Sequence, residues 1–337
     1  MRVRAHAHQS FPGNLRADLL ALTQSCQDEI HRAQCAAIEL ADVYARVVTE
    51  LLREGALLPT TVRAIGAHGQ TVRHRPERGY SVQINAPALL AERTGIAVVA
   101  DFRSRDIASG GQGAPLVPAF HQAAFWRPGE ALAVLNLGGI ANLTLIDPAG
   151  GTIGFDCGPA NTLIDGWIRK HRGSEFDAGG SWAAGGRVAP ALLHDLLAEP
   201  YFAALPPKST GQELFNLAWL HRALAAHATL GPQDVQATLA ELTAATVAQD
   251  LQRHLPEART VLVCGGGSEN ADLVQRLRRL MPGVDVVSSS VRGIPPQQVE
   301  AAAFAWLAAR TLAGLPGNVP AVTGAAGPRV LGAVYPA

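Results

Sequence analysis

Three glycine-rich segments follow apolar, strand-like runs and could present backbone N–H groups to an anion. They are Leu137-Gly138-Gly139, Asp156-Cys157-Gly158-Pro159 and Cys264-Gly265-Gly266-Gly267. Glycine lets the backbone approach a ligand closely and turn its N–H groups toward a phosphate. No Gly-x-x-x-x-Gly-Lys-Ser/Thr sequence occurs, so none is a Walker loop. Each alone is more often a tight turn, but the three together favour a nucleotide site.

Asp156 ends a predicted strand and comes directly before a Gly-Pro turn into a predicted helix. A carboxylate at such a place can project into a cleft, where it could act as a general base or as a metal-linked acid. It could equally cap the following helix. The spacing alone leaves both interpretations open.

A run of alternating charge follows another predicted strand, and it consists of Asp101, Arg103, Arg105 and Asp106. From the residues alone, an internal network of opposite charges is the favoured interpretation. His68 lies in a glycine-flanked loop and could be a sugar ligand or a turn residue. Glu300 begins an apolar helix, where an acid stabilises the helix dipole, so capping is its default role.

The elements that must hold these residues alternate between helix and strand. Helical spacing predicts two helices between residues 15 and 54, one from residue 86, and others at 162–170, 189–197, 214–227, 232–255, 270–280 and 298–312. Apolar runs predict strands at 62–66, 80–84, 96–100, 132–137, 140–146, 152–155 and 260–264. Strands 132–155 form a β-meander, and the best domain cut lies near Pro128. Polar residues crowd the strand ends, where open α/β sheets place ligands.

Composition narrows the class of partner. The 337 residues are 48% hydrophobic and 17% charged, with 28 basic and 28 acidic residues. A net charge of zero gives no field that would collect nucleic acid or an anionic membrane, so a small molecule is the expected partner. The four cysteines are far apart, and no apolar run reaches the roughly 18 residues of a membrane helix. These features predict a cytoplasmic protein.

Seven segments resemble the anhydro-N-acetylmuramic acid kinases, in one order and from about Phe11 to Gly324. They are Ile65 to Pro76, Ala100 to Leu116, Asn136 to Asn142, Gly154 to Asp165, Pro207 to Gly211, Val263 to Gly267 and Gly293 to Ala301. The resemblance implies a two-domain α/β kinase of the actin-like, hexokinase-type fold. Its N-terminal domain would comprise residues 1–128, completed by 300–337, and its C-terminal domain residues 129–299.

The resemblance also implies a reaction. ATP with Mg²⁺ would phosphorylate the 6-oxygen of 1,6-anhydro-N-acetylmuramic acid while water opens the anhydro ring, in the recycling of cell-wall sugars. Asp156 would be the base that activates the water. Gly138 and Gly139 would lie at the phosphates, Gly265, Gly266 and Gly267 at the adenosine, Glu300 near the metal, and His68, Arg103 and Asp106 near the sugar. Many such kinases form dimers, so the resemblance allows a homodimer, but the sequence does not fix the oligomeric state.

The sequence departs from this family's pattern at its start. The family begins with a strand and a Gly-Thr-Ser-x-Asp-Gly phosphate loop, and no such loop occurs here. Val3 to Ser10 is interpreted as a late strand of that first sheet, so the first strands of the N-terminal domain are expected to be missing, and we favour a chain start placed too late. Cys157 stands where the family usually has Thr. The alternatives are a kinase for another anhydrosugar or a hexose, and a sugar-binding protein that lost turnover with the loop.

Overall fold

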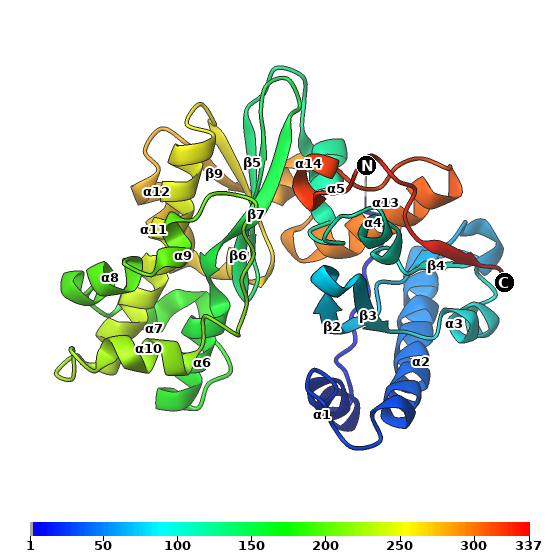
Figure 1. Ribbon diagram of the computed structural model, residues 1–337, viewed down its shortest axis with the longest axis horizontal. Coiled ribbons are helices and arrows are strands. Elements are labelled where there is room, and N and C mark those ends of the chain that lie inside the picture. Colours follow the sequence, from blue (N-terminus) through cyan, green and yellow to red (C-terminus); the bar gives the residue numbers. More distant parts are fainter. Residues whose placement is uncertain (1–2) are drawn as a thin grey trace. The chain divides into compact units, whose positions relative to one another are not determined.

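The structure is a computed structural model, and it describes residues 3–337. Contacts divide the chain into two compact units (Figure 1). Unit 1 contains the residues up to Phe120 together with Glu300–Ala337, and unit 2 contains His121–Val299. The first boundary falls inside helix α5 (Val117–Phe125), earlier than the predicted cut at residue 128.

Unit 1 holds a three-stranded sheet, a two-stranded hairpin and several helices. The strands are β1 (Ile65–Gly66), β2 (Gln70–Arg75), β3 (Tyr80–Ile84), β4 (Val98–Ala100) and β10 (Ala333–Tyr335). The helices are α1 (Gly13–Ala21), α2 (Glu29–Gly55), α3 (Pro87–Thr94), α4 (Ser104–Ala108), α13 (Val299–Leu312) and α14 (Pro320–Thr323). The sheet has the order β1-β4-β10, with β1 parallel and β10 antiparallel to β4.

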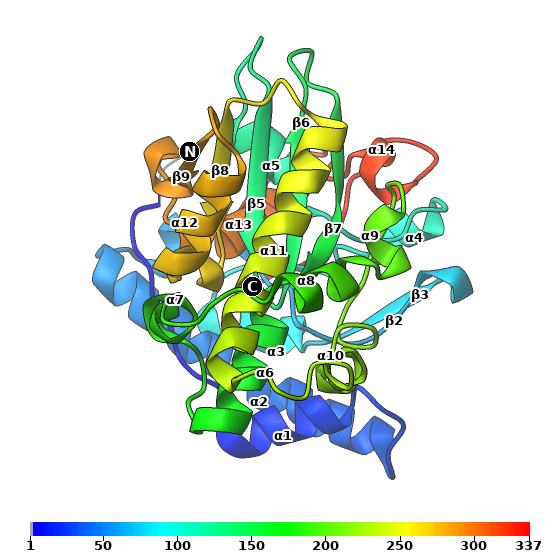
Figure 2. The ribbon, with the colours of Figure 1, turned by 90° about the vertical axis from the view of Figure 1, so that its left-hand side faces the viewer.

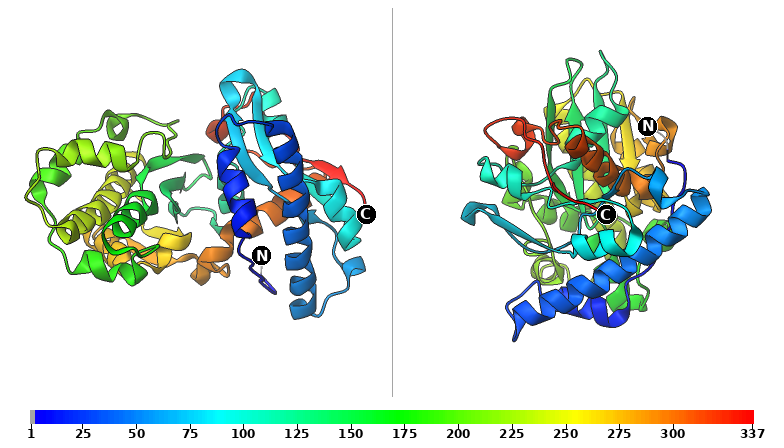
Figure 3. Two further views of the ribbon diagram at one scale, coloured as in Figure 1. Left: turned by 90° about the horizontal axis from the view of Figure 1, so that it is seen from below. Right: turned by 90° about the vertical axis from the view of Figure 1, so that its right-hand side faces the viewer.

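Helix α2 forms much of the core of unit 1. Its residues Ala36, Leu40 and Val43 recur at helical spacing and are almost fully buried. This stripe packs beside α1 (Figure 3), in a cluster with Leu15 of α1 and Ile84 of β3. The two helices predicted between residues 15 and 54 are therefore confirmed.

Unit 2 is a five-stranded mixed sheet with helices. The strands are β5 (Leu132–Leu137), β6 (Ile140–Ile146), β7 (Thr152–Pro159), β8 (Thr260–Cys264) and β9 (Asp285–Ser288). The helices are α6 (Asn161–Arg172), α7 (Ser181–Ala184), α8 (Pro190–Leu197), α9 (Pro200–Ala203), α10 (Leu217–Leu224), α11 (Pro232–His254) and α12 (Ala271–Leu280). The order is β7-β6-β5-β8-β9, in which β5 to β7 are antiparallel neighbours and β8 and β9 run parallel to β5. The predicted meander is confirmed.

Helix α11 runs across one face of this sheet (Figure 2). Its Val247 and Leu251 pack in one core with Leu135 of β5. Leu132 and Val134, on the other face of β5, are also 0% exposed, so both faces of this strand are covered. A strand buried on both faces reads as a continuous apolar run, which is why β5 could be predicted from its residues.

Several sequence predictions need correction. Strand β7 continues to Pro159 and pairs there with Ile140, so Asp156-Cys157-Gly158-Pro159 is not a turn. The residues 3–10, predicted as a strand, contain no regular structure. Strands β2, β9 and β10 were not predicted, since they are short or mainly polar. No helix among residues 3–337 is long and apolar enough to cross a membrane.

Candidate active site

Asp156 lies inside β7, and its carboxylate is held through one oxygen only. The Oδ2 atom accepts hydrogen bonds from the Ser209 hydroxyl and from the Thr210 backbone N–H, each at 3.0 Å. No hydrogen bond among residues 3–337 uses the Oδ1 atom. A carboxylate oxygen can accept a further hydrogen bond, so the Oδ1 atom remains free for a donor such as water.

The surroundings of Asp156 raise the pKa of its carboxyl group above the ordinary value. Loss of hydration on burial is the main cause, and the hydrogen bonds from Thr210 and Ser209 offset part of it. A higher pKa makes the carboxylate a stronger proton acceptor. The helix-capping interpretation is wrong, because α6 begins after Ala160 and Asp156 pairs with Asn142 inside the sheet.

The glycine turns after β5 and β8 lie next to one another. These strands pair in parallel with Asn136 opposite Cys264, so both turns leave the sheet at the same edge. A Cβ added to Gly265, whose φ is +79°, would lie 2.3 Å from the Asn136 Oδ1 atom, and one added to Gly267 would lie 2.7 Å from the Leu137 Cβ atom. Two of the three predicted glycine segments are thus brought together, and only glycine fits where they meet.

These turns also supply backbone donors. The carbonyl groups of Gly138 and Gly139 accept hydrogen bonds from the N–H groups at the start of α6. Among residues 3–337, the N–H groups of Gly138, Gly139, Gly266 and Gly267 donate to no protein acceptor. Free N–H groups in glycine-rich turns are suited to phosphate oxygens.

A pocket of about 410 Å³ adjoins the turn after β8, and Gly266, Gly267, Asn161 and Asp165 are among the residues that line it. Partial burial raises the pKa of Asp165 to about 6, with Asp177 and Glu175 adding to the rise and Arg169 opposing it. The pocket thus combines the glycine backbone with an acceptor side chain, which is an arrangement that a nucleoside could use.

In unit 1, His68 and Arg103 form one polar group. The Arg103 Nη2 atom lies 2.8 Å from the His68 Nε2 atom, and its Nη1 atom donates to the Gly113 carbonyl at 2.7 Å. Burial and the neighbouring guanidinium lower the pKa of His68 to about 4, so the ring is neutral and accepts through Nε2. Phe304 lies against the ring with centroids 4.5 Å apart. The predicted charge network with Asp101 is wrong, because the hydrogen bonds of Arg103 go elsewhere.

Asp106 is fully buried in unit 1, and both of its carboxylate oxygens accept hydrogen bonds from other residues of the chain. Its Oδ2 atom accepts from the Gly113 N–H at 2.8 Å, and its Oδ1 atom accepts from the Asn318 amide at 2.6 Å and from the Thr323 hydroxyl at 2.8 Å. These bonds tie the loop after α4 to the C-terminal segment. The position fits a residue that supports the loop beside Arg103, rather than one that touches a ligand directly.

Glu300 lies in the first turn of α13 with its side chain exposed. Burial lowers the pKa of Arg103, and the charge of Glu300 opposes that shift. No cluster of three or more His, Cys, Asp or Glu side chains among residues 3–337 could hold a metal ion. A single carboxylate suits Mg²⁺ that arrives with a nucleotide, because this ion is usually bound by one or two carboxylates together with phosphates.

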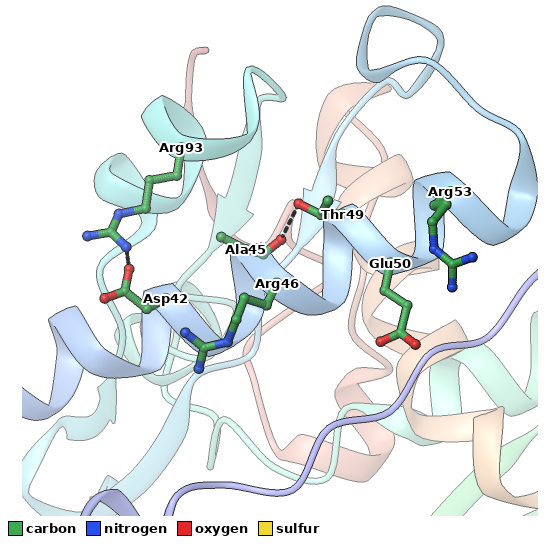
Figure 4. Close-up of a pocket in the computed structure, with 7 residues that line it drawn as sticks. All are labelled: Asp42, Ala45, Arg46, Thr49, Glu50, Arg53 and Arg93. Atoms are coloured by element: carbon green, nitrogen blue, oxygen red, sulfur yellow. Dashed lines mark hydrogen bonds and ion pairs between the residues drawn. The ribbon is translucent and has the colours of Figure 1, made fainter.

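A separate hollow of about 740 Å³ lies along the outer face of α2 (Figure 4). It is lined by charged side chains, including Arg46, Glu50 and Arg53, and Arg93 forms an ion pair there with Asp42. None of the predicted site residues lines it. It is therefore set apart from the candidate site.

Comparison with known proteins identifies the family. A family model described as anhydro-N-acetylmuramic acid kinase matches residues 1–337. The chain belongs to this family. An anhydro-N-acetylmuramic acid kinase of Variovorax paradoxus is 55% identical, over 99% of this chain and 92% of its own length. One of Pseudomonas paraeruginosa is 56% identical, over 97% of this chain and 90% of its own length.

Solved structures show a weaker likeness. An activator of the 2-hydroxyisocaproyl-CoA dehydratase from Clostridium difficile, with bound ADPNP, covers 76% of this chain and is covered over 77% of its own length, at 14% identity and a TM-score of 0.42. A score this low adds nothing to the argument. Membership of the anhydro-N-acetylmuramic acid kinase family confirms the predicted family, the α/β kinase fold and the carbohydrate-kinase class.

Sequence reasoning did not assign roles to the residues that hold Asp156. Ser209 and Thr210 stand in a segment that resembles this kinase family, but their spacing from Asp156 gives no sign of contact. Asp165 was likewise given no role in the nucleotide pocket. The likeness of Pro207 to Gly211 to this family was the only sequence signal that pointed to Ser209 and Thr210.

Proposed function

We propose that this protein transfers the γ-phosphoryl group of ATP to the 6-oxygen of 1,6-anhydro-N-acetylmuramic acid and opens the anhydro ring with water. The relatives that match over nearly the whole chain are named as kinases of this sugar. The observation that carries the mechanism is the Asp156 carboxylate, which is oriented through Oδ2 and has no protein donor on Oδ1 among residues 3–337.

In this mechanism Asp156 accepts a proton from a water molecule that attacks the anomeric carbon. The bond from that carbon to the bridging 6-oxygen breaks, and the 6-oxygen takes the γ-phosphoryl group while ADP leaves. The products are N-acetylmuramic acid 6-phosphate and ADP. Holding the water and the phosphoryl acceptor in place avoids the entropic cost of a termolecular encounter.

The other predicted residues have distinct roles in this proposal. The free N–H groups of Gly138, Gly139, Gly266 and Gly267 bind phosphate oxygens, and the pocket beside Gly267 receives the nucleoside. The His68–Arg103 pair binds the sugar, and Asp106 supports it through Gly113. Glu300 would hold Mg²⁺, which would offset the charge of the phosphates.

We place the reaction in the cytoplasm, where ATP is available, and propose a homodimer, as in many such kinases. Size-exclusion chromatography with light scattering tests the dimer. A mass equal to that of one 35.3 kDa chain would contradict it.

Mass spectrometry of the product formed in heavy-oxygen water tests the coupled reaction. The heavy oxygen must appear at the anomeric position of a ring-opened 6-phosphate. A phosphorylated product that keeps its anhydro bridge would refute the coupling. Parallel reactions with a hexose and with a different anhydrosugar test the choice of sugar.

Asp156→Asn tests the base. Asn keeps the size of the side chain but cannot take the proton, so turnover should fall about 10²- to 10⁴-fold while ATP binding and the melting temperature change little. Asp285→Asn is the matched control, because Asp285 is an exposed aspartate at the start of β9. Near-parental turnover of Asp156→Asn would exclude Asp156 as the base.

A further inference from the structure

A buried ion pair lies behind the loop that holds Asp156. The Lys208 Nζ atom is 3.2 Å from the Asp250 Oδ1 atom and 3.1 Å from the Oδ2 atom, and both side chains are 3% exposed. Lys208 lies in the loop before α10, and Asp250 lies near the end of α11. The pair therefore fastens this loop to the long helix that covers the sheet.

A backbone hydrogen bond joins Lys208 to Asp156. The Asp156 N–H donates to the Lys208 carbonyl at 3.2 Å. The next two residues of the loop, Ser209 and Thr210, supply both hydrogen bonds to the Asp156 Oδ2 atom. A shift of Lys208 would consequently move every donor that orients the carboxylate.

Two aromatic rings complete the enclosure of the lysine. The Nζ atom lies 5.5 Å from the ring centroid of Phe155 and 5.3 Å from that of Tyr201. Phe155 precedes Asp156 in the strand, and the Tyr201 hydroxyl donates to the Asp156 carbonyl at 2.8 Å. The side chain before Asp156 in the strand and the side chain that bonds to its carbonyl group thus both lie against one ammonium group.

Stability alone does not account for such a pair. Removing two charges from water is costly, and well-packed apolar residues in place of a buried ion pair are often as stable or more so. What an ion pair adds is a fixed geometry. We propose that the Lys208–Asp250 ion pair positions the Ser209–Thr210 segment and thereby orients the Asp156 carboxylate toward the attacking water. This inference rests on the proposed function, in which Asp156 is the base.

The pair also contributes to the charge around the base. Lys208 lowers the pKa of Asp156, and Glu213 raises it. Tyr201 and Cys157 interact electrostatically with both Asp156 and Asp250, and Arg253 and His254 lie 3.7 Å and 4.0 Å from the Asp250 Oδ1 atom. Because the base acts when deprotonated, loss of the Lys208 charge should move the acid limb of the kcat/KM profile to higher pH.

The experiment compares Lys208→Met, the double variant Lys208→Met/Asp250→Leu and the control Arg276→Met. Arg276 of α12 is a partly buried cation that forms an ion pair, at 2.9 Å, with Glu241. Glu241 lies on α11, the helix that also carries Asp250. Lys208→Met should lower kcat about 10²-fold, as expected for a displaced catalytic group, and shift the acid limb upward. Arg276→Met should lower the melting temperature without changing kcat or the limb.

The double variant separates positioning from folding. It removes both buried charges, so its melting temperature should recover toward that of the parent. A low kcat in this well-folded variant supports the proposal, because a folding defect then no longer explains the loss. Recovery of kcat together with the melting temperature would overturn it, as would a parental kcat and acid limb in Lys208→Met.

Different results would refute the proposed function and the positioning role of Lys208. A parent protein that does not phosphorylate the anhydro sugar, or an Asp156→Asn variant with parental turnover, refutes the function or its base. An active parent with an inactive Asp156→Asn and a fully active Lys208→Met refutes only the positioning role.

Discussion

Gly266→Ala separates ligand binding from folding at the turn after β8. A Cβ added to Gly266 would have no heavy atom within 4 Å, and the residue is not in the left-handed region. The folded protein can therefore accept the methyl group. By restricting the unfolded chain, the substitution should even stabilise the protein by about 0.4 to 1 kcal/mol.

The expected effect on the nucleotide is opposite in sign. A methyl group at the turn would keep a phosphate or ribose group from approaching the free N–H donors. Loss of one hydrogen bond to a charged group costs about 1.5 to 3 kcal/mol. The dissociation constant for ATP should therefore rise about 10- to 150-fold.

Calorimetry with a non-hydrolysable ATP analogue measures the affinity, and a thermal melt of the same sample measures stability. Gly13→Ala is the matched control, since its Cβ also meets nothing within 4 Å and Gly13 lies on α1 of unit 1. Gly265→Ala is the contrast, because its Cβ would lie 2.3 Å from the Asn136 Oδ1 atom, and it should lower the melting temperature. Parental affinity in a normally folded Gly266→Ala would show that the nucleotide does not lie against this turn.

Two further predictions concern unit 1. Asp106→Asn replaces an acceptor that faces three donors, so the free energy of unfolding in denaturant should fall by about 1 to 3 kcal/mol. The KM for sugar should change little. Unchanged stability with a raised KM would instead indicate a direct sugar contact. His68 has a pKa of about 4 in the folded protein, so the unfolded chain takes up its proton first as pH falls, and the free energy of unfolding should decline between about pH 6.5 and 4. His68→Gln should reduce that decline, and an imidazole that titrates by NMR near pH 6.5 would contradict it.

The parts of the fold that could be predicted from the sequence are those with a local signal. Strands β5, β6 and β8 begin and end where predicted, because each is a mainly apolar run next to glycine. The predicted end of β7 was wrong, because Gly158-Pro159 has the sequence of a turn but pairs with the start of β6. Strand β10 has only three residues and owes its pairing to Val98–Ala100, far away in the sequence.

The candidate site shows the same division. The glycine turns stand after predictable strands, and Asp156 directly follows the predicted part of β7, so residue type and position made them candidates. The partner of Lys208 could not be found in this way, because Asp250 looks like any polar residue of a helix until α11 is placed on the sheet. The donors to Asp106 could not be found for a related reason: they come from a loop and from two distant residues, Asn318 and Thr323.

The pairing of β10 with β4 has a consequence for synthesis of the chain on the ribosome. Unit 2 is one continuous segment, so it can fold as soon as Val299 has emerged. The sheet of unit 1 is complete only when Ala333–Tyr335 has joined Val98–Ala100. Nascent chains usually fold their N-terminal domain first. Here the order should be reversed, and the edge of β4 must wait unpaired through the translation of the whole of unit 2, exposed to pairing with other chains.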